Sequence, residues 1–212
     1  MLNKLSFNNI FIPRRIDEIE EKEKTKIQKI LQQEIIEGDL DLREINWIED
    51  LGNIREVKGN AYLRNSSIKS LGKLERVEGD LWLDNSQIQS LGNLRYVGGW
   101  LCLQNTPIQS LGNLEYIGEN LLLQNSQIQS LGNLQHIGGS LDLRNTSIQS
   151  LGNLQYVGWN LDLQNSQIQS LGNLEYVGGW IDLRNNPLLE LPKKELNKIL
   201  SKIEIGGGVY VE

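Results

Sequence analysis

The sequence predicts a mainly β fold, a parallel β-solenoid of twenty-residue coils with a helical cap at each end. The first observation behind this prediction is a motif, Ile-Gln-Ser-Leu-Gly-Asn-Leu, that occurs unchanged at 88–94, 108–114, 128–134, 148–154 and 168–174. A looser copy starts at Ile68, again twenty residues before the next one. Self-similarity at a short fixed period is the sequence signature of a stacked repeat protein.

The second observation is a set of apolar columns inside the repeat. In the copy at 160–179, six apolar side chains are expected to point inwards: Leu161, Leu163, Ile168, Leu171, Leu174 and Val177. One coil cannot bury these side chains, whereas coils stacked about 4.8 Å apart through parallel strand ladders form a continuous apolar core. We therefore predict a solenoid over residues 39–191, made mostly of β coils and turns.

The N-terminal segment, residues 1–38, departs from the repeat. Its isoleucines fall near helical spacing among Glu and Lys, which predicts a helix of about six turns from Pro13 to Glu37. The end of a solenoid exposes apolar side chains and unpaired strand edges. The helix is expected to cover that end.

The C-terminal segment, residues 192–212, is expected to be the second cap. A short helix is predicted at 193–201, and two apolar segments at 203–205 and 209–211 flank three consecutive glycines. The two caps and the solenoid together are predicted to form one structural domain.

Two further columns are expected to shape the coil rather than to bind a ligand. An asparagine follows each Leu-x-Leu strand, and we predict that these amides form a buried hydrogen-bonded ladder: Asn65, Asn85, Asn105, Asn125, Asn145, Asn165 and Asn185. A glycine recurs where a turn needs positive φ or where backbones approach closely: Gly72, Gly92, Gly112, Gly132, Gly152 and Gly172.

Composition narrows the classes of function. The formal net charge of −6 over 212 residues opposes a broad phosphate-binding surface, so no nucleic-acid partner is expected. Cys102 is the single cysteine, which excludes an intrachain disulfide. No stretch has the length and apolar character of a signal peptide or a membrane span, so no membrane partner and a cytoplasmic location are expected.

The repeat order Val-Gly-Gly-x-Leu-x-Leu-x-Asn-x-x-Ile-x-x-Leu-x-x-Leu resembles the leucine-rich repeat superfamily, over roughly residues 40–191. In detail it is most similar to the repeat of receptor L domains. The resemblance implies a right-handed single-stranded parallel β-solenoid that binds protein partners and has no catalytic activity. It implies no functional residue, because the shared motif consists of structural positions only.

Candidate binding residues come from the columns that vary between repeats. The positions that alternate with the strand leucines form one outward face, aromatic and apolar towards the N-terminal end and acidic towards the other. The candidate partner-binding residues on this face are Tyr62, Trp82, Trp100, Leu122, Asp142, Asp162, Asp182 and Trp180. Trp82 and Trp100 are the leading candidates, because exposed aromatic side chains often mark partner contacts. The alternative is that these large side chains shield the strand ladder.

No catalytic, metal-binding or cofactor-binding site is predicted. The three stacked aspartates supply too few oxygens for calcium, so a solvated stripe beside Arg144 and Arg184 is the preferred interpretation. His136 replaces a tyrosine in a column of tyrosines and is expected to pack in an aromatic stack. Cys102 is expected to be an ordinary surface thiol. The Val-Gly-Gly turns lack the helix and lysine of a phosphate-binding loop.

The favoured function is therefore a non-enzymatic scaffold that presents a variable strand face to a protein or peptide. One alternative is a β-helix that binds or cleaves a polysaccharide, since two carboxylates suffice for glycoside hydrolysis. Another alternative is a structural, self-associating repeat protein. The sequence leaves the partner and the oligomeric state open.

Overall fold

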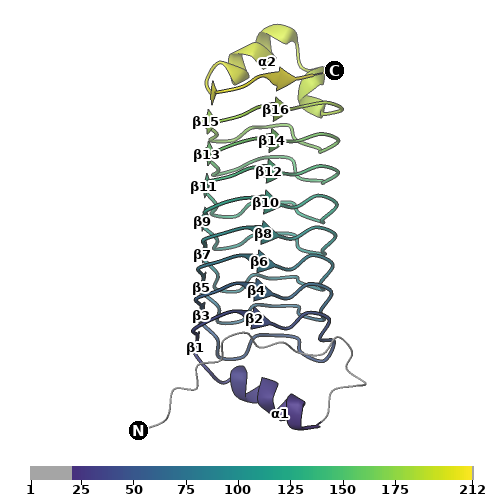
Figure 1. The fold of residues 1–212 in the computed structure, drawn as a ribbon. Coiled ribbons are helices and arrows are strands. Elements are labelled where there is room, and N and C mark those ends of the chain that lie inside the picture. Colours follow the sequence, from purple (N-terminus) through teal and green to yellow (C-terminus); the bar gives the residue numbers. More distant parts are fainter. Residues whose placement is uncertain (1–20, 212) are drawn as a thin grey trace.

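A computed structural model describes residues 21–211, which stack into one column of coils with a helix at each end (Figure 1). Each coil contributes one two-residue strand to each of two parallel nine-stranded sheets. Sheet A consists of β1 Ile35–Ile36, β3 Glu56–Val57, β5 Arg76–Val77, β7 Tyr96–Val97, β9 Tyr116–Ile117, β11 His136–Ile137, β13 Tyr156–Val157, β15 Tyr176–Val177 and β17 Glu204–Ile205. The predicted parallel β-solenoid is confirmed.

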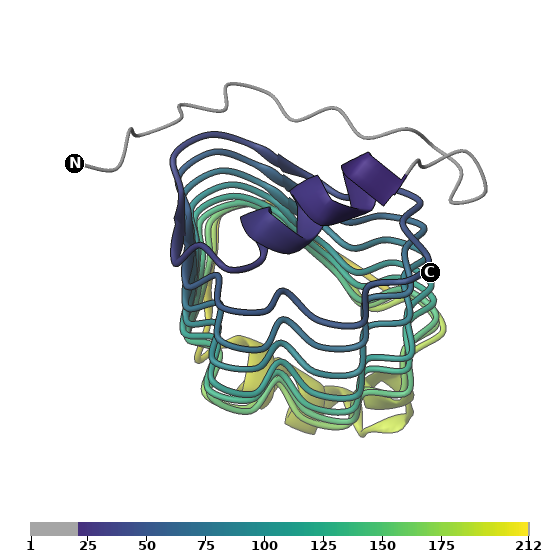
Figure 2. The ribbon, with the colours of Figure 1, turned by 90° about the horizontal axis from the view of Figure 1, so that it is seen from below.

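Sheet B runs along an adjacent side of the column, and its strands alternate along the chain with those of sheet A (Figures 1 and 2). Its strands are β2 Leu40–Asp41, β4 Ala61–Tyr62, β6 Leu81–Trp82, β8 Leu101–Cys102, β10 Leu121–Leu122, β12 Leu141–Asp142, β14 Leu161–Asp162, β16 Ile181–Asp182 and β18 Val209–Tyr210. Neighbours pair one repeat apart, so Val157 lies beside Val177 and Leu161 beside Ile181. Equivalent residues therefore stack directly on one another.

The apolar core fills the inside of the column. The six columns predicted to point inwards are buried along the solenoid, and Leu161, Leu163 and Ile168 have no exposed surface. The chain is extended with alternating side-chain directions at the strands and turns sharply between them, so each coil sends its leucines inwards and its polar residues outwards. Burial of these columns against the next coil is the main stabilisation of the stack.

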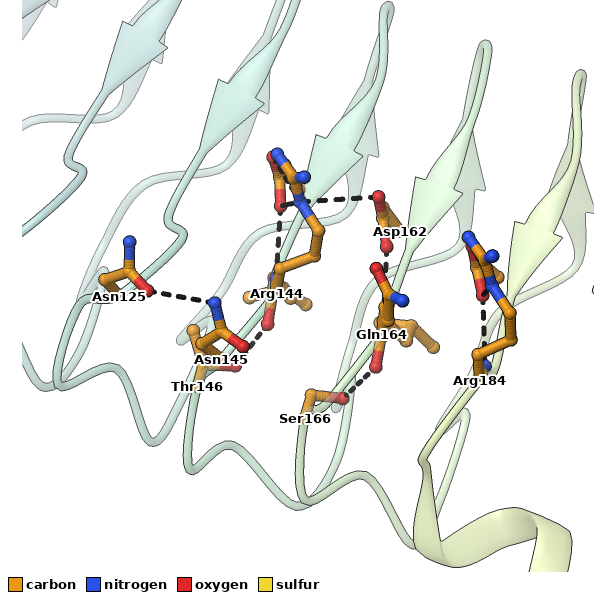
Figure 3. Close-up of polar contacts among 12 residues, drawn as sticks. Asn125, Arg144, Asn145, Thr146, Asp162, Gln164, Ser166 and Arg184 are labelled. Carbon is orange, nitrogen blue, oxygen red and sulfur yellow. Dashed lines mark hydrogen bonds and ion pairs between the residues drawn. The ribbon is translucent and has the colours of Figure 1, made fainter. Parts of the chain in front are cut away.

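The asparagine column lies at an exposed turn, which corrects the prediction of a buried ladder. These seven residues have positive φ, between 54° and 59°, a conformation that Asn tolerates better than most side chains. Their amides face solvent and bond between alternate pairs of coils, as from Asn145 Nδ2 to Asn125 Oδ1 at 3.0 Å (Figure 3). The buried polar column is the residue that follows each of them: Ser66, Ser86, Thr106, Ser126, Thr146, Ser166 and Asn186.

Buried hydroxyls in that following column close the turn. Thr146 Oγ1 donates to the carbonyl of Leu143 at 2.7 Å, and Ser166 Oγ donates to that of Leu163 at 2.8 Å (Figure 3). The predicted positive φ of the glycine column is confirmed, for example 58° at Gly152.

The N-terminal cap is α1, Glu21–Ile30, which lies across the first coil (Figure 2). Ile27 and Ile30 are buried against the core, so the predicted covering role is confirmed for this helix. The predicted start at Pro13 lies outside the described residues. The predicted end at Glu37 is wrong, because the chain turns after Ile30 and then forms β1, which pairs with β3. Two β-branched residues beside an open sheet edge gain ladder hydrogen bonds that a continued helix would leave unmade.

The helix α2, Lys193–Leu200, agrees with the short helix predicted at 193–201. A 3₁₀ turn that was not predicted, η2 Pro187–Glu190, precedes it within the residues assigned to the solenoid. The apolar segments beyond α2 form β17 and β18, which extend both sheets by one strand. Of the helices in residues 21–211, neither has the length and apolar character needed to cross a bilayer.

Candidate functional site

Trp82 and Trp100, the leading candidates, pack against each other on the outer side of sheet B. Their rings stack with centroids 6.3 Å apart and an interplanar angle of 15°. The Arg64 guanidinium lies over the Trp82 ring, 4.5 Å from its centroid. Both indoles are only half-exposed, and Trp82 Nε1 is buried without a hydrogen-bond partner. These contacts favour the interpretation that the two rings shield the strand ladder.

Cys102 is buried beneath this aromatic cluster, which corrects the prediction of a surface thiol. Its strand position faces outwards, between Trp82 and Leu122 on the neighbouring strands. The larger neighbouring side chains cover the small thiol. Burial, together with the negative charges of Asp84 and Asp80, raises the pKa of Cys102 to about 12. The thiolate needed for nucleophilic chemistry is therefore strongly disfavoured.

Two members of the aspartate column, Asp142 and Asp182, are each bound by the arginine two residues later in the chain. Asp142 accepts a two-pronged hydrogen bond from Arg144, with Nε to Oδ1 at 3.0 Å and Nη2 to Oδ2 at 2.6 Å (Figure 3). Asp182 binds Arg184 in the same way and is only 3% exposed. Such forked pairs use the oxygens that a cation would need. The column is an ion-paired surface rather than the predicted solvated stripe.

Asp162 lies between these two pairs and has Gln164 where its neighbours have arginine (Figure 3). It accepts the Gln164 N–H at 3.1 Å and lies 3.4 Å from Arg144 Nε, which is already bound to Asp142. Burial raises the pKa of Asp162, and the flanking carboxylates Asp142 and Asp182 add to the rise. Of the three aspartates, Asp162 is thus the one whose negative charge has no arginine of its own to balance it.

The tyrosine column forms a continuous aromatic stack on sheet A, as predicted. His136 lies between Tyr116 and Tyr156, with centroids 4.9 and 4.4 Å away and nearly parallel rings. Burial in the stack lowers the pKa of His136. Across residues 21–211 the structure contains no cluster of three or more His, Cys, Asp or Glu side chains arranged to hold a metal ion.

The remaining candidates are dispersed along the face. The Tyr62 ring lies 5.4 Å from the Arg43 guanidinium and its hydroxyl accepts from Asn60 at 3.1 Å. Trp180 meets Tyr210 edge to face at 5.9 Å, and Leu122 is half-buried. The structure brings together Trp82 with Trp100, and the three aspartates with one another, but it does not join these groups into one site.

A second arrangement lies at the corner where each coil enters sheet B. We define the corner column as the residue before each sheet B strand: Asp39, Asn60, Asp80, Trp100, Asn120, Ser140, Asn160, Trp180 and Gly208. Its polar side chains accept the backbone N–H of the next corner residue, as from Ser140 N to Asn120 Oδ1 at 2.6 Å. Trp100 and Trp180 cannot extend this ladder, because an indole has no acceptor.

The residue before each corner residue belongs to a glycine column: Gly38, Gly59, Gly79, Gly99, Glu119, Gly139, Trp159, Gly179 and Gly207. Wherever the corner residue is Asn or Asp, the glycine-column residue of the next coil is a glycine. The Oδ1 of the Asn or Asp occupies the space that a Cβ on that residue would need. Only Glu119 and Trp159 carry side chains in this column. They follow Trp100 and Ser140, two corner residues that do not place an amide or carboxylate in that space.

Glu119 and Trp159 flank the bare coil at Gly139, and a recess lies between them. A cavity of about 390 Å³ is lined by Gly118, Glu119, Asn120, Gly138, Gly139, Ser140 and Trp159, and we call it the Gly139 slot. The Trp159 side chain is 68% exposed. Sequence reasoning missed this residue, although a tryptophan in a column of glycines is a signal visible in the repeat alignment.

Comparison with protein-family models finds no match for this chain, and comparison with curated proteins finds no significantly similar sequence.

Proposed function

We propose that the protein is a non-enzymatic binding scaffold that captures a protein or peptide segment at the Gly139 slot and the adjoining corner column. The stack of coils supplies a rigid support, since equivalent residues are held in register by both sheets. A rigid site loses little conformational entropy when a ligand binds. The resemblance to leucine-rich repeats agrees with a binding role.

The observation that carries this proposal is the exposed Trp159 indole beside a recess floored by glycine. A large aromatic ring kept in solvent costs hydration free energy and contributes little to this fold, whereas such rings are frequent anchors in interfaces. The contrast with Trp82 and Trp100 is direct, because those two rings stack on each other and Arg64 lies over Trp82. The proposed site therefore lies at the corner column, which includes the candidates Trp100 and Trp180, rather than on the strand face.

A random peptide library displayed on phage and selected on the immobilised full chain tests the proposal. We expect selected peptides to bind the wild-type protein and to lose binding to Trp159→Ala. Tyr210→Ala is the matched control, because it removes another exposed aromatic ring at the far end of the column. Unchanged melting temperatures for both variants establish that the fold is intact. Recovery of no peptide that depends on Trp159 would reject the proposal.

Carbohydrate binding is the second candidate, because an exposed indole beside Glu119, Asn120 and Ser140 also suits a sugar ring. Cleavage has less support, since the slot offers one carboxylate and the clustered aspartates of sheet B engage arginines. A glycan panel probed with wild type and Trp159→Ala separates the two candidates. Binding of a glycan that depends on Trp159, without any peptide, would favour the carbohydrate.

A structural, self-associating role is the third candidate. Light scattering on the full chain tests it directly. The full chain is required, because removing α1 would expose the core side chains that Ile27 and Ile30 cover. A concentration-independent monomer would argue against this role. We also propose a cytoplasmic location, where a protein with one buried cysteine needs no disulfide for its stability.

A further inference from the structure

The Gly139 slot has the dimensions of one planar group. Glu119 and Trp159 occupy equivalent positions two coils apart, with Gly139 on the coil between them. Two coil spacings amount to about 10 Å. Carbon atoms in contact lie about 3.5–4 Å apart, so a flat group about one atom thick fits between the two side chains.

All lining residues of the slot except Trp159 lie in a part of the chain without Lys or Arg. Residues 96–143 contain neither Lys nor Arg. The arginines on either side of this stretch are both engaged, Arg95 with Glu115 at 3.2 Å and Arg144 with Asp142 at 2.6 Å. The exposed Glu119 carboxylate is thus a negative charge whose neighbourhood offers no counter-charge for the slot.

Glu119 is held in place by a neighbouring indole. Trp100 Nε1 donates to Glu119 Oε2 at 2.5 Å, and this contact uses one of the two carboxylate oxygens. The bond limits the rotamers of a side chain that would otherwise move freely in solvent. The other oxygen, Oε1, stays available to a ligand in the slot.

Three backbone N–H groups at the floor of the slot are already engaged. The backbone N–H groups of Gly138 and Gly139 donate to the carbonyls of Ile117 and Glu119 on the preceding coil, both at 2.9 Å. The Ser140 N–H donates to Asn120 Oδ1. The floor carbonyls and the Glu119 carboxylate keep lone pairs beyond these bonds and can accept hydrogen bonds from a cation, while the side chains of Asn120, Ser140 and Trp159 also carry N–H or O–H donors.

We propose that the Gly139 slot binds a cationic side chain of the peptide partner, an arginine in the first instance, between the face of Trp159 and the Glu119 carboxylate. This inference rests on the proposed peptide-binding function and names its chemistry. A guanidinium is planar, stacks on indoles and donates in a fork that matches a carboxylate. A lysine ammonium shares the charge but lacks the flat shape.

The test uses the peptides that depend on Trp159 together with a minimal probe. We expect these peptides to share an Arg, or less often a Lys, at one position. In ¹H–¹⁵N NMR spectra, acetyl-Gly-Arg-Gly-amide is expected to shift the Trp159 indole and Gly139 signals, and acetyl-Gly-Gln-Gly-amide to leave them unchanged. The same titration with acetyl-Gly-Lys-Gly-amide compares the affinity of the slot for lysine with its affinity for arginine.

Glu119→Gln distinguishes a charged contact from packing alone. We expect this variant to bind the selected Arg peptide about three- to fivefold more weakly than wild type at low salt, which is the range of an exposed ion pair. The difference in affinity should shrink at high salt, because salt screens exposed charges. Gln135→Glu is the control, because it adds a charge at an exposed position on another side of the coil.

The two proposals fail in different ways. Trp159-dependent peptides without a shared basic residue, or binding unaffected by Glu119→Gln, would overturn the cationic inference and leave the peptide-binding function standing. Absence of any Trp159-dependent peptide would overturn both.

Discussion

Asn120 and Gly139 are coupled across adjacent coils. Asn120 Oδ1 accepts the Ser140 N–H at 2.6 Å, and the same oxygen fills the place that a Cβ on residue 139 would occupy. The side chain that links the coils at a corner therefore determines which residue fits in the next coil. Where the corner is Ser140 instead, the next coil carries Trp159.

Gly139→Ala is expected to destabilise the solenoid. The added Cβ would meet Asn120 Oδ1 and the Glu119 carbonyl carbon, the latter at 2.7 Å, so the coil must shift. A loss of about 1–3 kcal/mol in unfolding free energy is typical for such overpacking. Denaturant unfolding measures it. Gly208→Ala is the matched control, because a Cβ there meets no atom within 4 Å.

The coupling itself is tested from the other side of the slot. Ser140→Asn alone is expected to destabilise the protein, since its Oδ1 would compete with the Trp159 Cβ, and Trp159→Gly in the same chain should restore stability. A double-mutant cycle that gives additive effects would contradict the coupling.

Asp162→Asn and Asp182→Asn are expected to change stability in opposite directions at pH 7. Burial raises the pKa of Asp162 above 3.8, so its contribution to stability is present below 3.8 and is lost as the pH rises through the folded pKa. Arg184 lowers the pKa of Asp182, so that contribution is present above 3.8 and is lost as the pH falls through the folded pKa.

Thermal unfolding at pH 7 and pH 3 checks both signs. Asp162→Asn should raise the melting temperature at pH 7 and have a smaller effect at pH 3, whereas Asp182→Asn should lower it at pH 7. Equal decreases for the two variants at pH 7 would show that the forked arginine bonds do not distinguish the two carboxylates.

His136→Tyr is expected to stabilise the protein most at acidic pH. Burial lowers the pKa of His136 below 6.5, so the stability of the neutral imidazole is fully present above 6.5 and is lost as the pH falls through the folded pKa. Tyrosine keeps the stack between Tyr116 and Tyr156 and has no charge to acquire. Melting curves should show a larger difference in melting temperature between His136→Tyr and wild type at pH 5 than at pH 8. An equal difference at both pH values would refute the explanation.

Cys102 is expected to resist thiol reagents in the folded protein. Its thiol is buried and its pKa is raised to about 12, so the reactive thiolate is scarce at pH 8. Labelling with a chromogenic disulfide should be slow for wild type and complete after denaturation. Trp82→Ala should accelerate it by uncovering the thiol, and an unchanged rate would contradict the shielding role of that indole.

Much of the fold could be predicted because its columns repeat. Positions such as Leu161 and Leu163 recur with one period in several coils, and only stacking buries all of them at once. The stack containing His136 and the positive φ of Gly152 follow from the same repetition, because a position that is fixed in every coil has a fixed environment.

The candidate site was only partly accessible from the sequence. The strand face was predicted as the variable surface, yet Trp82 and Trp100 stack on each other there and Cys102 is buried. The Gly139 slot depends on which side chains two adjacent coils place in one corner. A search for substitutions within the glycine column would have found Glu119 and Trp159, but not the cavity between them.

The sequence by itself determined the twenty-residue period, the inward apolar columns and the capped parallel stack, because stacking the coils buries all of these columns at once. The tertiary structure decided what each outward residue meets. In the structure, strand β1 follows soon after Ile30 and the asparagines lie at exposed turns. Cys102 is buried and Trp159 is exposed to solvent. These outcomes depend on contacts between coils, where the size of a neighbour twenty residues away governs exposure.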